Sequence, residues 1–494
     1  MRNLTRRALL LGTGAVVGGL ATRPLTPRTP SMAGIVPVVP SADAHLLNDA
    51  SGLSETPVFS HTILNQTTAD DQLAALRQAL KDAAATGRAV NIGAARHSMG
   101  GQAIPRDGFA LTFAGGTLEL DSAALTCRVS AGMRWAAVIA TLDPLGFSPK
   151  VMQSNNDFGV AATFSVNAHG WAVPHGPMGS TVRSVEMVLP DGSQVMASRA
   201  TNADLFRAAM GGYGLIGLLT ALEIEVVPNQ RLTPTFAELP AADLAPAFMA
   251  AVADPMVSMA YGRLNVDRAR FFQDALLITY RATPDQTDLP PAGGSGFVSK
   301  VSRQIFRAQL GNEPAKRLRW GGETRVGPTI AGDATRNALF NEPVITLDDR
   351  NPARTDILHE YFVAPEAFPG FLQACAEVIP QSYQELLNVT LRYVAPDPDA
   401  MLSYATEPRI AAVMLFSQEM TARAEGDMAR MTAALIDRVL DIGGSYYLPY
   451  RLHATGAQFA RAYPGATAFA GQKRALDPRL ILRNALWDKY LEKL

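Results

Sequence analysis

A polar loop near residue 97 carries the side chains best suited to chemistry in this chain of 494 residues. It runs Asn91-Ile-Gly-Ala-Ala-Arg-His-Ser-Met-Gly-Gly-Gln102. Its glycines permit tight backbone, so amide groups can converge on an anion, and Arg96 adds positive charge. Ser98 and Gln102 supply hydrogen-bonding side chains. Taken alone, the loop is no more specific than an ordinary glycine turn, so it needs support from other segments.

Two further segments rich in glycine and small residues follow that loop. Residues 159–170 run Gly159-Val-Ala-Ala-Thr-Phe-Ser-Val-Asn-Ala-His-Gly170, a composition that lets backbone approach a flat or charged ligand. Residues 211–217 run Gly-Gly-Tyr-Gly-Leu-Ile-Gly and include a G-x-G-x-x-G pattern. This pattern follows a predicted helix and opens a predicted strand, the reverse of a Rossmann unit, and no phosphate-binding P-loop motif is present.

Other kinds of site are not supported by the sequence. The seven histidines are scattered without an H-E-x-x-H or carboxylate cluster, so no metal site is predicted. No Gly-x-Ser-x-Gly elbow is present, which argues against an α/β-hydrolase. The only cysteines, Cys127 and Cys375, exclude a disulfide framework. A net charge of -1 offers no electrostatic case for nucleic acid, so we expect a small-molecule partner.

The chain length and composition predict several structural parts. A single hydrophobic core stops growing near about 250–300 residues, so two lobes are expected. We predict an export signal and the start of a linker at 1–32, the linker itself at 33–54, and a first lobe at 55–229. A second lobe is predicted at 230–440, followed by a C-terminal segment at 441–494.

The first residues have the pattern of a targeting signal. Arg6-Arg7 precedes the apolar residues 8–21, a run shorter than the roughly 20 residues that a membrane-spanning helix needs. Thr5-Arg6-Arg7-Ala8-Leu9-Leu10 resembles a twin-arginine signal, with a general secretory signal as the alternative. We therefore expect export, to the periplasm, by an export machinery and without a stable membrane anchor.

Periodicity predicts the elements that position the polar loop. A helix at 70–85, ending near Gly87, leads into a short strand at 89–93 that runs into the loop. Further strands are expected at 109–113, 125–129, 182–189 and 218–227, and helices at 133–142 and 204–210.

The second lobe is expected to contain strands at 275–280, 360–363, 386–394 and 410–416 and an amphipathic helix at 422–440. Residues 284–333 show little pattern. Strand alternation at 386–394 places Asn388, Thr390 and Arg392 on one face. Such a face contacts a ligand or, as the alternative, faces solvent or forms salt bridges.

Three motifs in order carry a resemblance to a known family. Arg96-His-Ser-Met-Gly-Gly-Gln102 resembles the flavin-attachment loop of the vanillyl-alcohol oxidase (para-cresol methylhydroxylase) superfamily. The Asn-x-His-Gly end of residues 159–170 and the Leu-Phe-x-x-x-x-Gly-Gly-x-Gly-x-x-Gly segment at 205–217 match that family's next two motifs. The resemblance lies near the alditol and sugar-lactone oxidase and cytokinin dehydrogenase branches.

The resemblance implies an α+β protein with a two-lobed FAD-binding domain and a substrate domain whose antiparallel sheet covers the flavin. It implies FAD, bound covalently through His97, although a histidine that touches FAD without a bond is the alternative. The implied cofactor-binding residues are Gly93, Ala94, Arg96, His97, Ser98, Met99, Gln102, Ser154, Gly159, Ser165, Asn167, Gly214, Gly217 and Leu219.

The closing segment and the second lobe supply the candidate catalytic residues. Tyr450 and His453 resemble part of the family's returning segment, with ordinary aromatic packing as the alternative, while Arg392 and Asn388 lie on the polar strand face. Cytokinin dehydrogenases carry an aspartate where this chain has Ser154 or Asn155, and Asp157 is displaced by a few residues. This departure leaves the proton acceptor unassigned.

The expected reaction is oxidation of a polar alcohol, sugar-like or lactone substrate by hydride transfer to flavin N5. Reoxidation by oxygen or another electron acceptor would follow. Two alternatives stay open: amine oxidation of the cytokinin dehydrogenase kind, and an exported flavin-binding protein without catalysis.

Overall fold

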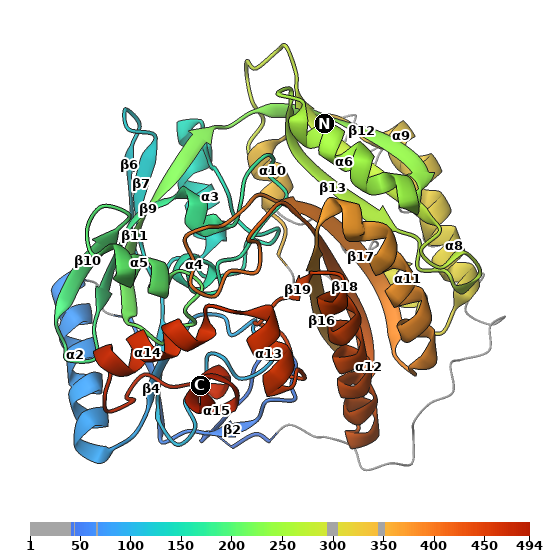
Figure 1. The fold of residues 1–494 in the computed structure, drawn as a ribbon. Helices are drawn as coiled ribbons and strands as arrows, with labels where there is room; N and C mark the ends of the chain where they lie inside the picture. Colours follow the sequence, from blue (N-terminus) through green and yellow to red (C-terminus); the bar gives the residue numbers. More distant parts are fainter. Residues whose placement is uncertain (1–40, 44, 66–67, 294–304, 344–350) are drawn as a thin grey trace. The chain divides into compact units, whose positions relative to one another are not determined.

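A computed structural model describes residues 41–43, 45–65, 68–293, 305–343 and 351–494 (Figure 1). The predicted export signal, and the predicted linker as far as residue 40 together with residue 44, lie outside these residues. The chain divides into two compact units. Unit 2 comprises Val39–Asn229, Val394–Pro408 and Ser445–Leu494, and unit 1 comprises Gln230–Tyr393 and Arg409–Gly444 in its described part. Helices and largely antiparallel sheets are mixed in the chain, which confirms the predicted α+β class.

Unit 2 begins with a helix and a small parallel sheet. Helix α2 (Ala69–Thr86) starts where the Thr68 hydroxyl accepts a hydrogen bond from the backbone N–H of Asp71, and it ends at Gly87 with φ 65°. Strands β3 (Ser60–Leu64) and β4 (Val90–Gly93) pair in parallel with β5 (Phe109–Phe113). Strand β4 therefore delivers the chain directly into the loop that contains His97.

An antiparallel sheet follows in unit 2, with strand order β10-β9-β11-β7-β6. Its strands are β6 (Leu118–Asp121), β7 (Thr126–Ser130), β9 (Val182–Val188), β10 (Gln194–Ser198) and β11 (Leu218–Pro228), and β8 (Phe147–Pro149) pairs with the end of β11. The helices of this region are α3 (Trp135–Leu142), α4 (Val160–Ser165) and α5 (Ala203–Ala209). These bounds confirm the strands and helices that periodicity predicts for the first lobe.

The C-terminal segment is fastened to β4 by backbone bonds and a buried ion pair. It contains α13 (Gly456–Ala462), α14 (Ala466–Leu476) and α15 (Ala485–Lys489). The N–H of Val90 donates to the carbonyl of Ile481 at 2.7 Å. Asp477, which pairs with the buried Lys473, accepts the N–H groups of Ile481 and Leu482 at 2.9 and 2.8 Å. The tail thus lies beside the strand that leads to His97.

Unit 1 is built on an antiparallel sheet in which β15-β12-β14-β13-β17-β18-β16 are neighbours. The strands are β12 (Arg231–Pro240), β13 (Val257–Leu264), β14 (Asp274–Ala282), β15 (Ala334–Thr335), β16 (Arg354–Val363), β17 (Glu385–Val394) and β18 (Arg409–Glu419). Its longer helices include α6 (Leu244–Ala253), α11 (Phe368–Val378) and α12 (Ala422–Asp441). Leu387, Val389 and Leu391 are fully buried on one face of β17. This is the apolar face that strand alternation predicts.

The stretch that looked weakly patterned in the sequence contains an unpredicted helical segment. Helix α8 (Glu313–Gly321) continues as a π-helical turn, η5 (Gly322–Val326), and then as α9 (Gly327–Ile330). The only residues buried in α8 are Ala315 and Lys316, so it has no apolar stripe that a periodicity analysis can detect. Its start is marked only by Asn312, whose side chain accepts the N–H of Ala315.

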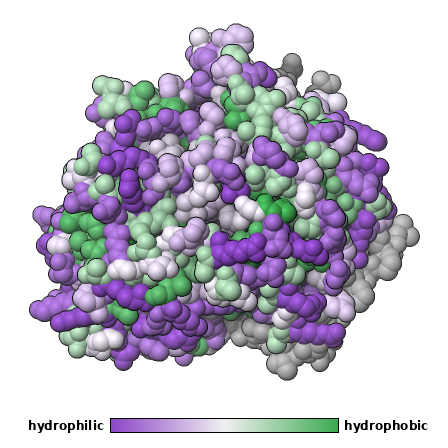
Figure 2. Space-filling model, viewed as in Figure 1, coloured by the Kyte–Doolittle hydropathy of each residue, from purple (hydrophilic) through white to green (hydrophobic). Residues whose placement is uncertain are grey.

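One face of the described residues carries mostly polar side chains. Figure 2 shows a face on which hydrophobic side chains occur in small groups among hydrophilic ones. No helix within the described ranges is long and apolar enough to cross a membrane.

Candidate functional site

The loop after β4 is held in shape by Gln102. The backbone N–H of Gly100 donates to Gln102 Oε1 at 2.8 Å, and Gln102 Nε2 donates to the carbonyls of Leu448 and Tyr450 at 2.6 and 2.9 Å. Gln102 is 3% exposed, so these bonds are buried and costly to lose. Gln102 is predicted to line the diphosphate. In the structure its side-chain amide joins the loop to the C-terminal segment.

His97 lies between an acid and an aromatic ring. Its Nε2 is 3.8 Å from Asp157 Oδ2, and its ring stacks on Phe158 with centroids 4.2 Å apart. Burial lowers the pKa of His97, Asp157 opposes this effect, and Arg134 adds to it. The net pKa lies below the usual value, so the imidazole is neutral at pH 7 and keeps a ring lone pair available.

Arg96 is a half-buried cation without an acidic partner among the described residues. It adopts φ 50°, and one terminal nitrogen donates to the carbonyl of Leu111 at 3.2 Å. Its Nε is buried and has no hydrogen-bond partner in the part of the chain that the structure describes. Burial lowers the pKa of Arg96 to about 10. A half-buried cation whose Nε lacks a partner is suited to an anion such as a diphosphate.

The three glycine-containing motifs meet in unit 2. A Cβ at Gly159 would lie 2.7 Å from Cβ of Ala94, so the first two motifs touch there and only glycine fits. The N–H of Tyr213 donates to the carbonyl of Ser165 at 2.9 Å, which joins the second motif to the third. The third also reaches β4, because a Cβ at Gly214 would lie 3.8 Å from Asn91 Nδ2.

The side chain of Asn91 on β4 has unsatisfied hydrogen-bonding groups at this junction. It is 1% exposed, and neither its Oδ1 nor its Nδ2 has a hydrogen-bond partner among the described residues. Buried side-chain amides normally form hydrogen bonds, so the amide of Asn91 beside Gly214 is suited to a polar ligand. Together with Arg96, it shows that the residues present fit an anionic nucleotide cofactor.

Asn167 has a structural part in the second motif. Its Nδ2 donates to Asp397 Oδ2 at 2.6 Å, its Oδ1 accepts the N–H of Gly179 at 2.9 Å, and its carbonyl accepts the Tyr404 hydroxyl at 2.6 Å. Burial raises the pKa of Asp397. Asn167 was predicted to bind the cofactor, but its side chain is occupied by these contacts, which hold segment Val394–Pro408 against α4.

An aromatic cluster surrounds the end of the second motif. Tyr447 contacts the rings of His169, Tyr404 and Tyr450, with centroid distances of 6.2, 5.0 and 5.7 Å. The Tyr447 hydroxyl donates to the carbonyl of Val166 at 2.8 Å. Tyr450, a candidate catalytic residue, is thus brought beside the Asn-x-His-Gly motif, and His453 follows three residues later.

The other predicted cofactor residues fall into two groups. Gly93, Ala94, Ser98, Ser154 and Ser165 lie in or beside the segments that meet near His97, and the Ser98 hydroxyl has no hydrogen bond to the described residues. Met99 donates its N–H to the carbonyl of Pro449 at 2.7 Å. Gly217 and Leu219 pack beside β9, because a Cβ at Gly217 would lie 2.9 Å from the sulfur of Met187.

The candidate catalytic residues of unit 1 lie on β17 as predicted. Asn388 and Arg392 are half-buried on the same face as Thr390. Asn388 Oδ1 accepts hydrogen bonds from Arg263 at 2.9 Å and Arg319 at 3.0 Å. These two arginines were missed by the sequence analysis, since α8 was not recognised and Arg263 on β13 carries no local motif.

No group of three or more histidine, cysteine or carboxylate residues able to hold a metal is found within the described ranges.

Sequence comparisons with known proteins also indicate FAD binding. Residues 71–198 match the family model described as an FAD binding domain. A stretch of 126 residues is 34% identical to an alditol oxidase from a Streptomyces species, covering 25% of this chain and 29% of that protein. Two proteins from Oryza sativa subsp. japonica also match: a mitochondrial L-galactono-1,4-lactone dehydrogenase 2, 28% identical over 38% of this chain and 32% of the relative, and cytokinin dehydrogenase 1, 30% identical over 27% and 26%.

Residues 71–198 therefore form an FAD-binding domain. It is of the para-cresol methylhydroxylase type, and its relatives include the alditol oxidase, lactone dehydrogenase and cytokinin dehydrogenase branches that the three motifs indicated. The matched regions span less than a third of the length of these relatives.

Proposed function

We propose that this protein is an FAD-dependent oxidoreductase that oxidises a polar alcohol, sugar-like or lactone substrate. Two observations carry the proposal: the buried amide of Asn91 beside Gly214 and the buried Nε of Arg96 both lack hydrogen-bond partners among the described residues, and both residues lie in the segment that leads to His97. The similarity to proteins named alditol oxidase and D-arabinono-1,4-lactone oxidase supports the substrate class.

Several residues would hold the cofactor. Arg96 would neutralise the diphosphate, Ser98 would donate a hydrogen bond, and Gly159 and Gly214 would let backbone approach closely. When bound, FAD accepts a hydride from the substrate carbon at flavin N5 and passes two electrons to oxygen or another acceptor. Arg392 and Asn388 are proposed to hydrogen-bond the substrate hydroxyl, and Tyr450 and His453 to border the active site, where a side chain that accepts the hydroxyl proton is required.

We also propose that His97 bonds covalently to the flavin. Its neutral imidazole, held by the stack on Phe158 and by Asp157, presents a ring nitrogen with a free lone pair. Acid denaturation tests the bond: flavin should stay with the wild-type polypeptide and leave the His97→Ala variant. Flavin that remains attached to His97→Ala would assign the bond elsewhere.

The function is tested by mixing the purified protein with candidate substrates under nitrogen and then admitting air. We expect loss of the flavin's visible absorbance with alditols or sugar lactones, and its return with oxygen or an added acceptor. Bleaching by amines alone would favour the cytokinin dehydrogenase alternative. A yellow protein that none of these compounds bleaches would indicate flavin binding without catalysis.

Export to the periplasm through the twin-arginine route is proposed from residues 1–21. Changing Arg6-Arg7 to Lys-Lys should leave the protein in the cytoplasm, whereas unchanged delivery would favour a general secretory signal.

A further inference from the structure

The segment Val394–Pro408 belongs to unit 2 and packs on the second glycine-containing motif from outside the stretch that matches the FAD-binding family. The N–H of Ala395 donates to the carbonyl of His175 at 3.2 Å. The Tyr404 hydroxyl donates to the carbonyl of Asn167 at 2.6 Å. Backbone and side chains of the segment therefore both fix the end of this motif.

Asp397 is the acidic residue of the segment that lies against Asn167. It is 7% exposed, and its Oδ2 accepts Asn167 Nδ2 at 2.6 Å. Its Oδ1 accepts the N–H groups of Asp399 and Ala400 at 3.1 and 3.2 Å. These donors are neutral, and no cation pairs with the Asp397 carboxylate among the described residues. Burial and the charge of Asp399 raise the pKa of Asp397, while its hydrogen bonds oppose this rise and favour the ionised form.

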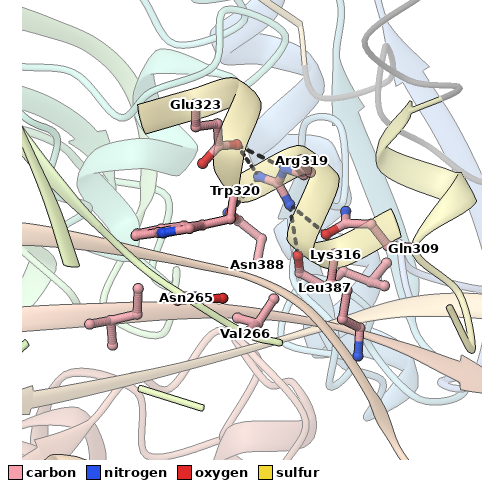
Figure 3. Close-up of a pocket in the computed structure, with 10 residues that line it drawn as sticks. Asn265, Val266, Gln309, Lys316, Arg319, Trp320, Glu323, Leu387 and Asn388 are labelled. Carbon is pink, nitrogen blue, oxygen red and sulfur yellow. Dashed lines mark hydrogen bonds and ion pairs between the residues drawn. The ribbon is translucent and has the colours of Figure 1, made fainter. Parts of the chain in front are cut away.

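Charged groups at two other places in the fold have partners of opposite sign. The buried carboxylate of Asp477 pairs with Lys473. In unit 1 the guanidinium of Arg319 is joined to Glu323 at 2.8 Å (Figure 3). A carboxylate without a cationic partner is unfavourable to bury. The fold thus retains at Asp397 a negative charge that an asparagine, of nearly the same size, would avoid.

Helix α4 (Val160–Ser165) connects this charge to the proposed flavin attachment point. Phe158, whose ring stacks on His97, lies just before the helix, and Asn167 lies just after it. The helix has 6 residues and is about 9 Å long. A buried charge acts over such a distance, because little water or salt screens it.

We propose that the buried charge of Asp397 lowers the reduction potential of the bound flavin. Transfer of a hydride to the flavin adds two electrons and one proton, and thus one unit of negative charge, which a fixed carboxylate disfavours. The electrons then pass more readily to oxygen or another acceptor. Asp397 acts through its place beside Asn167, so it is a positioning residue. The inference rests on the proposed function, because it requires FAD in this domain.

The test is the reduction potential of the FAD-loaded full chain, measured by equilibration with a reference dye under nitrogen. Asp397→Asn should shift the equilibrium toward reduced flavin about tenfold or more, which for a two-electron couple is a rise of about 30 mV. Asp397→Glu keeps the charge and should stay close to the wild type. An unchanged potential in folded, flavin-loaded Asp397→Asn overturns the proposal.

Asp399→Asn is the matched control for loss of a carboxylate. Asp399 lies two residues further along, but it pairs with Arg199 at 2.7 Å and its side chain is 22% exposed, so its charge is screened. Its removal should change the potential little. Tyr404→Phe is the control for loosened structure, because it removes a hydrogen bond to Asn167 without changing charge. A rise in Tyr404→Phe equal to that in Asp397→Asn would overturn the role of the charge.

Thermal unfolding identifies variants that fail to fold. If Asp397→Asn is one of them, Asp397→Ser makes the same test, since its hydroxyl accepts a hydrogen bond but carries no charge. Protein that holds no flavin would remove this inference together with the proposed function. Flavin-loaded protein whose potential does not depend on Asp397 would remove the inference alone. Flavin that no candidate substrate bleaches would count against the proposed oxidation and leave the comparison of potentials unaffected.

Discussion

Nε2 of His97 lies 3.8 Å from Oδ2 of Asp157. The pair lies at the proposed flavin attachment point. Asp157 opposes the effect of burial on the imidazole and fixes one side of the ring, while Phe158 fixes its face. This arrangement makes Asp157 a positioning residue for His97.

Asp157→Asn should slow covalent flavin incorporation about tenfold or more, because the imidazole loses the charged partner that orients it. The measurement is the rate at which acid-resistant flavin appears when apoprotein is mixed with FAD. Asp157→Glu keeps the charge and should retain most of the rate. Equal rates for wild type and Asp157→Asn would remove Asp157 from this role.

Covalent incorporation should also depend on pH through His97. Its pKa is lowered below 6.5, so the rate should be level above pH 6.5 and fall as acid protonates the ring. The free energy of unfolding changes with pH in the same direction. Because the pKa of His97 is lower in the folded than in the unfolded protein, its contribution to stability is present above the unfolded-state pKa and is lost as the pH falls. Incorporation that instead rises as pH falls from 6.5 would contradict a neutral imidazole.

Arg96→Met should have opposite effects on the apoprotein and on FAD affinity. Removing a half-buried cation without an acidic partner among the described residues should raise the apoprotein's melting temperature, while losing the diphosphate contact should weaken FAD binding about 10- to 100-fold. The Kd is measured by titration in a His97→Ala background, where no covalent bond forms. Arg106→Met, at an exposed position of the same unit, is the control. Unaltered FAD affinity in Arg96→Met would show that Arg96 does not contact the diphosphate.

Lys473→Met should destabilise unit 2 by about 3–5 kcal/mol, because it leaves the buried carboxylate of Asp477 unpaired. Asp477→Ala should cost more, since it also frees the N–H groups of Ile481 and Leu482. Urea unfolding followed by circular dichroism measures both. Lys493→Met, at an exposed position near the end of the chain, should change little. A similar small loss for Lys473→Met would show that the tail is held by other contacts.

The elements predicted well were those whose burial follows a simple period. Helix α2 and strand β17 present regular apolar faces, and Gly87 ends its helix in the left-handed conformation that glycine favours. Helix α8 was missed because its buried residues are an alanine and a lysine. Periodicity of apolar residues carries no information about such a helix.

The candidate site was predictable only in part, for a similar reason. The segments around His97 and Gly214 are recognisable in the sequence by their composition and spacing. The contact of Asn167 with Asp397 joins residues 230 positions apart, and neither lies in a pattern that names the other. The pairing of Arg319 with Asn388 is likewise a product of tertiary packing. Local sequence therefore predicts the flavin-binding segments, whereas their supports emerge from the fold.

Unit 2 is assembled from three separate stretches of chain, and its last stretch ends at Leu494. The ribosome must therefore have passed residue 482 before the strand that leads to His97 gains its neighbours Ile481 and Leu482. Contacts between such distant residues slow folding, since long loops must close first. Loading of the cofactor accordingly waits for the C-terminal segment, and a protein truncated before residue 477 should be unable to retain flavin however well its earlier segments fold.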